Sequence, residues 1–340
     1  MRTATYRSFD PLLSASDADN LLRVCERFES YGLYSEEGLN EGLGEGLPQR
    51  FDSAFNYLRT GGRFGAASQE DIEALVARTN YFRETYAYGD EIHAPGIEPF
   101  LRFEGFLEAA REIFDRPVIE PAIVFANILL PGQELALHTD VPEFRGISRK
   151  LHPQWLCVVM HHSGLFDRWR MPIATAVSWY QDARGGAFAF YPDGVDAPAV
   201  AQPVRFNTAV ILDTDSVFHG VDRVASDTTE APPFKPGMRV HSLGEGSGRW
   251  EVRDGETPIG TYDWDEMRFS VSWKAYCFRT EEERDSWRSG TDDLSVDLVL
   301  DTLEDDLRAR GRIRDDRPPR KEFAEMMVDE YIRFPPVAAA

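Results

Sequence analysis

Cysteine is scarce in this sequence, and its few copies are widely spaced. The 340 residues include three cysteines, at positions 25, 157 and 277. Three is an odd number, and no Cys-x-x-Cys pair occurs, so the pattern does not indicate a disulfide framework. Proteins without such a framework are typical of reducing compartments, and we therefore expect a cytoplasmic protein.

Long apolar runs and an excess of basic residues are also missing. No apolar run approaches the roughly 20 residues of a membrane span, and the first residues lack the apolar segment of a signal peptide. The 58 acidic residues outnumber the 37 Lys and Arg, which gives a formal net charge of −21. A field of this sign favours solubility and repels phosphate backbones. We expect a soluble protein whose partners include neither nucleic acid nor membrane.

Helical periodicity is present in the first third of the chain and at its end. The expected helices are 17–30, a segment that opens at Ser68, 99–114, a short acidic helix after Thr280, and a final stripe at Val296, Leu300, Leu303 and Leu307. A Gly-rich loop is expected at 38–46. Core packing explains these apolar stripes. The pattern predicts a mainly helical part over 1–120 and C-terminal helices over 279–340, both integrated with one central core.

From Pro121 the sequence changes to short runs of β type that are separated by turn residues. The expected strands are 122–130, 155–160, 173–180, 187–191, 206–212 and 268–278. A polar, Gly- and Pro-rich stretch at about 225–267 is expected to be an insertion of the kind that forms lids or binding loops. Short strands in this number favour an α+β protein whose core, 121–278, is an antiparallel jelly roll.

Within this β-rich core, the segment His138-Thr139-Asp140 is followed far downstream by His219. Residues i and i+2 of a strand point to the same side, so His138 and Asp140 can reach one metal ion from a single strand. Two imidazoles and one carboxylate are the ligand set that holds iron(II) and leaves other positions open. Taken alone, the same spacing also fits a strand-end histidine bonded to a carboxylate.

Four stretches together resemble the iron(II)/2-oxoglutarate-dependent dioxygenases, most closely the prolyl-4-hydroxylase-like branch. They occur in the family's order and span about residues 121–278. The four stretches are Leu129-Leu130-Pro131-Gly132 with His138-Thr139-Asp140; 174–180 with the Gly185-Gly186 turn and 187–192; 207–212 leading to His219-Gly220-Val221; and Arg268-Phe269-Ser270-Val271-Ser272-Trp273. The resemblance implies a double-stranded β-helix, the cupin-like jelly roll, with the metal at its mouth.

The resemblance also implies a reaction and a set of ligands. His138, Asp140 and His219 would bind iron(II), with 2-oxoglutarate and dioxygen as co-substrates. The implied activity is hydroxylation of an unactivated C–H bond of a small-molecule or amino-acid-like substrate, with release of succinate and CO2. Desaturation, epoxidation and cyclisation remain open. Asp140 argues against halogenation, because halogenating relatives replace this carboxylate.

The far carboxylate of 2-oxoglutarate needs a cationic partner, and arginine suits it by its fixed charge and two-pronged geometry. Arg268 with Ser270 matches the Arg-x-Ser pair of some relatives. The family's arginine normally follows the distal histidine more closely than the 49 residues (268 − 219) found here. Arg223 is therefore an alternative. Asn127, on the first core strand, is a further candidate for a hydrogen bond to the keto acid.

Substrate contacts are predicted from a basic island in an otherwise acidic chain. The island contains Arg145 and Arg149 and follows the first two expected iron ligands, and His161 and Trp155 are further candidates outside it. Recognition of a small, possibly acidic molecule is one interpretation. The other interpretation is that the basic residues form salt bridges to nearby acids and that Trp155 packs in the core.

Two other functions fit the same jelly roll. One is a cupin-like metalloenzyme that does not use 2-oxoglutarate, in which case Arg268 and Ser270 would have no role. The other is a non-catalytic jelly-roll binding protein. Succinate formation coupled to oxygen uptake separates the oxygenase from both. The sequence does not indicate an oligomeric state.

Overall fold

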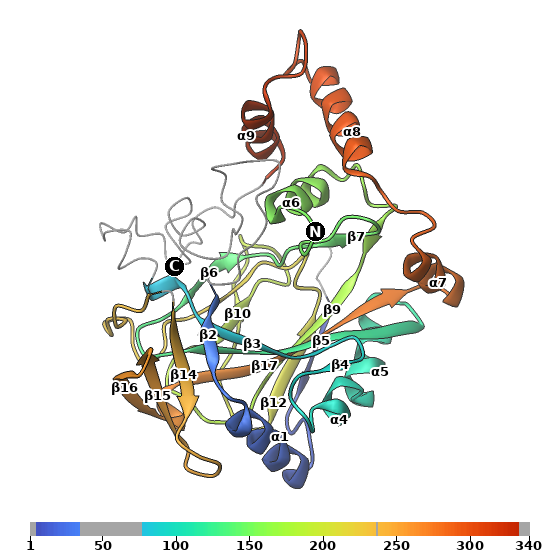
Figure 1. Cartoon of the computed structure of the whole chain (residues 1–340). Helices are drawn as coiled ribbons and strands as arrows, with labels where there is room; N and C mark the ends of the chain where they lie inside the picture. Colours follow the sequence, from blue (N-terminus) through green and yellow to red (C-terminus); the bar gives the residue numbers. More distant parts are fainter. Residues whose placement is uncertain (1–4, 35–76, 236, 333–340) are drawn as a thin grey trace.

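The computed structural model describes residues 5–34, 77–235 and 237–332 (Figure 1). The expected Gly-rich loop at 38–46 and the helix that opens at Ser68 lie outside the described residues. No helix in the described part of the chain combines the length and hydrophobicity needed to cross a membrane.

The core consists of eight strands that are divided equally between two antiparallel sheets. In chain order they are β5 (Val118–Leu129), β6 (Leu135–His138), β9 (Ile173–Trp179), β10 (Phe188–Phe190), β11 (Val200–Gln202), β12 (Thr208–Leu212), β13 (His219–Val221) and β17 (Arg268–Phe278). The larger sheet contains the order β12-β9-β17-β5, and the smaller has the order β11-β10-β13-β6. This topology is a double-stranded β-helix, so the predicted α+β jelly roll is confirmed.

Strands from outside the core extend the larger sheet at both edges. On one side β1 (Tyr6–Phe9) pairs with β12. On the other side, the added strands are β3 (Phe82–Tyr88) with the short β4 (Glu91–Ile92), β2 (Tyr31–Leu33), β14 (Met238–Ser242), β15 (Arg249–Asp254) and β16 (Thr257–Asp263). The region 1–120, which we expected to be mainly helical, therefore also supplies strands to the sheet.

The expected insertion at 225–267 is for the most part a three-stranded extension of this sheet, which corrects its interpretation as a lid or binding loop. Val240, Trp250 and Val252 are fully buried within the main core cluster. The alternation of these apolar residues with polar neighbours is the strand signal that the many glycines of this stretch concealed. The 3-10 turn Trp264–Glu266 then leads into β17.

The helices form two groups, of which one packs against the larger sheet and the other forms a separate cluster on the opposite side of the strands in the view of Figure 1. The first group contains α1 (Ala15–Arg27), α4 (Glu98–Leu101) and α5 (Glu104–Phe114). The second group contains α6 (Gln154–Ser163), α8 (Val296–Ala309) and α9 (Arg320–Tyr331), which share a separate core cluster. Helix α7 (Glu281–Ser289) follows β17, and the short strands β7 (Glu143–Phe144) and β8 (Arg170–Met171) pair with each other.

Helix α6 corrects the prediction of a strand at 155–160. Its first seven residues, Gln154 to Met160, are all buried. A short run that is apolar on every side fits a buried helix as well as a buried strand, so periodicity did not separate the two. The helix α1 also differs slightly from the expected range 17–30, because it begins at Ala15, where the Ser14 side chain caps it, and ends at Arg27.

Candidate metal centre

A tight turn connects β5 of the larger sheet to β6 of the smaller sheet. Gly132 adopts a positive φ of 86°, and a Cβ atom there would lie 2.4 Å from the backbone of Glu230 and Ala231. The buried Gln133 amide fixes the turn, because it accepts a hydrogen bond from the Leu130 N–H and donates to the carbonyls of Ala77 and Asn80. Strand β6 then ends at His138, at the mouth of the barrel.

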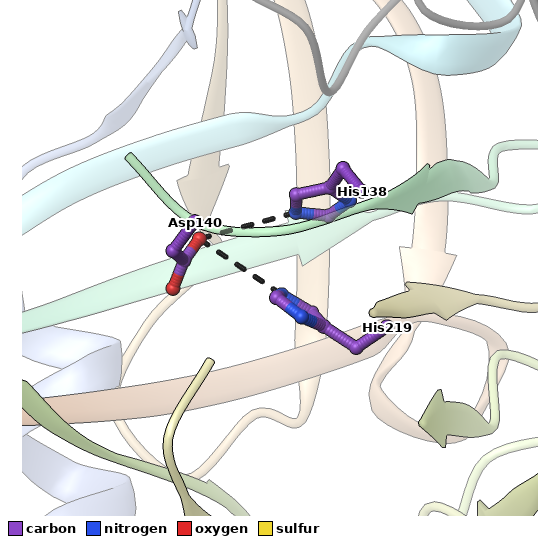
Figure 2. Close-up of side chains that lie close together, drawn as sticks. All are labelled: His138, Asp140 and His219. Atoms are coloured by element: carbon purple, nitrogen blue, oxygen red, sulfur yellow. Dashed lines mark ion pairs between the residues drawn. The ribbon is translucent and has the colours of Figure 1, made fainter. Parts of the chain in front are cut away.

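Register between two neighbouring strands brings the predicted ligands together. His138 in β6 lies directly opposite His219 in β13. Asp140 follows the end of β6, and its N–H donates to the carbonyl of Thr214 over 2.9 Å. Figure 2 shows both imidazoles directed toward Asp140. Each Nε2 atom lies 3.9 Å from Asp140 Oδ1, and one ligand atom from each residue lies within 4.8 Å of the others.

The outer nitrogens of both rings are held by backbone carbonyls. His138 Nδ1 donates to Ala136 O over 2.7 Å, and His219 Nδ1 donates to Val217 O over 2.9 Å. A proton on Nδ1 leaves the Nε2 lone pair free on the side that faces Asp140, which is the usual arrangement of metal-bound histidine. Burial, with the neighbouring His138, lowers the pKa of His219 to about 4. This imidazole is therefore neutral near pH 7, as a metal ligand must be.

The two oxygens of Asp140 have different surroundings. Oδ2 accepts hydrogen bonds from Lys274 Nζ and Thr214 Oγ1, both over 2.6 Å. Burial opposes ionisation of Asp140, but the Lys274 ammonium and the two imidazoles outweigh it and hold the pKa well below its usual range. Oδ1 faces the histidines. Neighbouring ligand atoms that share a first-row metal ion at about 2.1 Å lie about 3.0 Å apart, so the 3.9 Å separations would shorten by about 0.9 Å when one ion binds the three residues.

Lys274 is a contact that the sequence did not predict. It lies on β17 at the same strand face as Arg268, Ser270 and Ser272, and its side chain is 7% exposed. The sequence contained one signal for this contact. Lys274 is the lysine of an otherwise largely apolar strand, and a buried ammonium needs a carboxylate partner.

Arg268 and Ser270 line the same cavity as the three converging side chains. The Arg268 guanidinium donates from Nε to Gly186 O over 2.8 Å and from Nη1 to Ser270 Oγ over 3.0 Å. Among the described residues no carboxylate pairs with it, and burial lowers its pKa to about 9. The Asn127 amide also lines the cavity, and its oxygen is buried without a hydrogen-bond partner in the described part of the chain. The Arg268 guanidinium, without a carboxylate partner among the described residues, therefore offers this cavity a binding site for an anion.

Arg223, the predicted alternative to Arg268, is engaged elsewhere. Its Nε donates to Glu134 over 3.0 Å and its Nη1 donates to the carbonyl of Asp227. It is not among the residues that line the cavity. Of the two arginines, Arg268 is therefore the one whose position fits an anion next to the triad, the name used below for His138, Asp140 and His219.

The predicted substrate contacts divide into two groups. Arg149 lines the cavity that contains the triad. Arg145 instead pairs with Asp292 over 3.0 Å, and Trp155 is 1% exposed in the core cluster of α6 and the C-terminal helices. His161 is on α6 rather than on a strand, and it is the adjacent His162 that lines the cavity. The structure therefore favours salt bridging for Arg145 and core packing for Trp155.

Comparisons with known proteins give no match to a family model and none to a curated protein. Solved structures similar to this chain include a prolyl-4-hydroxylase from Pseudomonas putida, with 12% identity, a TM-score of 0.39, and coverage of 82% of this chain and 94% of that one. Another is HygX from Streptomyces hygroscopicus with nickel and 2-oxoglutarate bound, with 11% identity, a TM-score of 0.37, and coverage of 83% and 90%. A third is the α-ketoglutarate-dependent epimerase SnoN, with 9% identity, a TM-score of 0.39, and coverage of 81% and 78%.

Similarity at this level does not establish a family or an activity. The residues of the site provide two imidazoles and one carboxylate, a donor set that fits a first-row divalent metal. By its own strand order and side-chain geometry, this chain is a double-stranded β-helix protein with a His-x-Asp…His cluster at the mouth of the barrel.

Proposed function

We propose that this protein is an iron(II)- and 2-oxoglutarate-dependent oxygenase. It hydroxylates an unactivated C–H bond of a small-molecule or amino-acid-like substrate, with release of succinate and CO2. One observation carries the proposal. Two Nε2 lone pairs and the Oδ1 atom of Asp140 converge in a cavity that also contains the Arg268 guanidinium, for which the described residues offer no carboxylate.

The residues of the triad have distinct tasks in this proposal. When bound, iron(II) with 2-oxoglutarate and dioxygen supplies the oxidising chemistry that protein side chains lack. His138 and His219 contribute neutral nitrogen ligands whose orientation is set by backbone carbonyls. Asp140 contributes one oxygen, and its other oxygen is held by Lys274 and Thr214. Three ligands on one side leave positions for the keto acid and for dioxygen.

Arg268 and Ser270 bind the far carboxylate of 2-oxoglutarate. The guanidinium is oriented before binding, since Gly186 O and Ser270 Oγ hold it. An anion that arrives there supplies the counter-charge that this buried cation otherwise lacks, and charge-assisted pairing of this kind is strong where water is excluded. The Asn127 amide lines the same cavity, and its NH2 group would donate a further hydrogen bond to the keto acid.

The proposal is tested by turnover of 2-oxoglutarate in the purified protein. We expect succinate formation and oxygen uptake that depend on added iron(II). His138→Ala and Asp140→Ala should each abolish both and should also abolish binding of Mn(II), measured by electron paramagnetic resonance, because two ligands do not hold the ion. His241→Ala, at a histidine on β14, should retain both.

Three outcomes would count against the proposal. Retained turnover in either ligand variant would contradict the assignment of that residue. Oxygen uptake without succinate would favour a cupin-like metalloenzyme that does not use 2-oxoglutarate. Failure of the wild-type protein to bind Mn(II) would favour a non-catalytic binding protein.

A further inference from the structure

A second cavity adjoins the one that contains the triad. Its volume is about 330 Å³, which falls within the usual range for small-molecule sites. Six residues line both cavities, so the two spaces meet at a common wall: Tyr34, Arg83, Val141, Arg149, Gln154 and Lys274. A molecule in the second cavity therefore lies beside the metal ligands.

The walls that belong to the second cavity alone have an apolar part and a polar part. Ala122 and Ile123 of β5, Ile173 of β9, and the rings of Tyr88 and Tyr276 form the apolar part, and the polar part consists of Thr85, Glu91, His93, Glu143 and Lys150. The apolar part favours a ligand with a hydrocarbon or aryl body, because its burial removes apolar surface from water.

Arg83 projects from β3 into the junction of the two cavities, and it is 8% exposed. Its guanidinium lies between two aromatic rings, 4.1 Å from the centroid of Phe125 and 4.8 Å from that of Tyr34. Its Nε atom is buried without a hydrogen-bond partner, and no carboxylate among the described residues forms an ion pair with it. A guanidinium buried in this way is costly unless an anion joins it.

Arg149 approaches the same junction from the segment that follows β7. Its nearest carboxylate contact is Glu143, at 3.9 Å, which is too long for a hydrogen bond. Glu143 is in turn engaged by the Tyr276 hydroxyl over 2.7 Å. Arg149 thus retains hydrogen-bonding capacity toward the cavity.

The third cation of the junction is Lys274, which forms an ion pair with Asp140. Arg83, Arg149 and Lys274 face two carboxylates, Asp140 and Glu143, so the charge balance of the junction is positive in a chain whose formal net charge is −21. Two guanidiniums with unused donors, placed between a metal-ligand cluster and a partly apolar chamber, form a receptor for an anion with an apolar body.

We propose that the substrate of this enzyme is a carboxylic acid with an apolar body, whose carboxylate binds Arg83 and Arg149 and whose body occupies the second cavity. This assignment of substrate class rests on the proposed oxygenase function. It places the carboxylate at the junction, next to the cavity that contains the metal ligands, and the body in the second cavity.

The test uses two acids, each with its neutral primary amide of the same shape: 3-phenylpropionate with 3-phenylpropionamide, and hexanoate with hexanamide. The full chain is loaded with Mn(II) and 2-oxoglutarate, and the paramagnetic broadening of ligand NMR signals reports proximity to the metal. We expect at least one acid to bind at least tenfold more tightly than its amide. Arg83→Gln and Arg149→Gln should each raise the Kd of that acid at least tenfold.

Control variants separate this effect from loss of fold or of overall charge. Arg102→Gln removes one exposed positive charge away from both cavities and should leave the acid's Kd unchanged. Thermal unfolding shows whether Arg83→Gln is folded. If it is not, Arg83→Lys replaces it, and this variant should weaken the acid because it keeps the charge but loses the planar donor fork.

The outcomes distinguish the two proposals. If the wild-type chain binds Mn(II) and 2-oxoglutarate but neither acid binds better than its amide, the substrate class is wrong and the oxygenase assignment stands. Acid binding that is insensitive to both arginine substitutions would also overturn the substrate class. Failure to bind Mn(II) and 2-oxoglutarate would overturn the oxygenase function, and this inference with it.

Discussion

At the scale of single residues, Lys274 determines which oxygen of Asp140 is available. The ammonium and the Thr214 hydroxyl both bind Oδ2, so Oδ1 is the oxygen that faces the two histidines. A carboxylate held in this way offers one ligand atom in a fixed direction. When a group that hydrogen-bonds a metal-binding side chain is removed, metal affinity commonly falls 10- to 100-fold.

We therefore expect Lys274→Met to weaken Mn(II) binding by about 10- to 100-fold. Methionine fills a similar volume but supplies no donor to Asp140. Lys274→Arg keeps a charged donor and should recover part of the affinity. The measurement is a Mn(II) titration by electron paramagnetic resonance on folded protein. Equal affinity in the methionine variant and the wild type would show that Lys274 does not position Asp140.

Asp215 is a second buried acid near this site, and its surroundings differ sharply from those of Asp140. It is fully buried, and neither carboxylate oxygen has a hydrogen-bond partner in the described part of the chain. Arg170 is 4.0 Å away. Burial outweighs the attraction of Lys274 and raises the pKa of Asp215 to about 8. In the unfolded chain this carboxyl ionises near its ordinary value of about 3.9.

The sign of the resulting pH dependence follows from proton counts. Between about pH 4 and pH 8 the folded state binds a proton at Asp215 that the unfolded state has released, so this residue lowers stability increasingly as the pH rises. Asp215→Asn removes that cost. We expect its Tm to exceed that of the wild type by a larger margin at pH 8 than at pH 5. Asp90→Asn, at an exposed side chain, should show no such trend.

At the scale of elements, the turn between β9 and β10 positions Arg268. Gly186 has a φ of 63°, and its carbonyl accepts the hydrogen bond from Arg268 Nε. A Cβ atom at Gly186 would lie 3.0 Å from Arg268 Cδ and 3.2 Å from its Cβ. The Gly-Gly pair that was prominent in the sequence thus allows backbone and guanidinium to approach closely.

Gly186→Ala should accordingly weaken 2-oxoglutarate binding by about tenfold, which corresponds to about 1.4 kcal/mol. Gly255→Ala is a matched control, since it has a similar φ of 58° and nothing within 4 Å of the added Cβ. It carries the same kind of backbone strain and should leave 2-oxoglutarate binding unchanged. Isothermal titration calorimetry in the presence of Mn(II) measures both. Equal effects of the two substitutions would contradict a specific role for the Arg268 contact.

Elements also differ in how well the sequence predicted them. The strand that carries Arg268 was predicted because alternation and turn residues are local signals, whereas β6 and β13, which carry His138 and His219, were not among the expected strands. Helix α6 was predicted as a strand because a fully buried run has no distinguishing period. The Lys274–Asp140 contact spans 134 residues and depends on how β17 aligns with β5 and β9, which no local pattern specifies. The same holds for Arg83, which reaches the site through the pairing of β3 with β5.

At the scale of the whole molecule, the C-terminal helices are tied to the site through α6. Helices α8 and α9 share one apolar cluster with α6, and Gln154, Val158 and His162 of α6 line the cavity of the triad. Ile332, which follows α9, lines it as well. The expectation that 279–340 and the jelly roll form one integrated domain can therefore be tested at this apolar cluster.

Two leucines of α8 test whether the molecule unfolds as one unit. Leu303 is fully buried in the cluster with α6, whereas Leu298 on the same helix is 48% exposed. Leu303→Ala should cost about 2–5 kcal/mol of unfolding free energy, and Leu298→Ala should change it by about 0.5 kcal/mol or less. If the helices and the barrel are one cooperative unit, calorimetry will record a single transition that moves to lower temperature in Leu303→Ala. Two transitions, of which only one moves, would show that the C-terminal helices fold separately and that their contact with the cavity wall is not part of the barrel's stability.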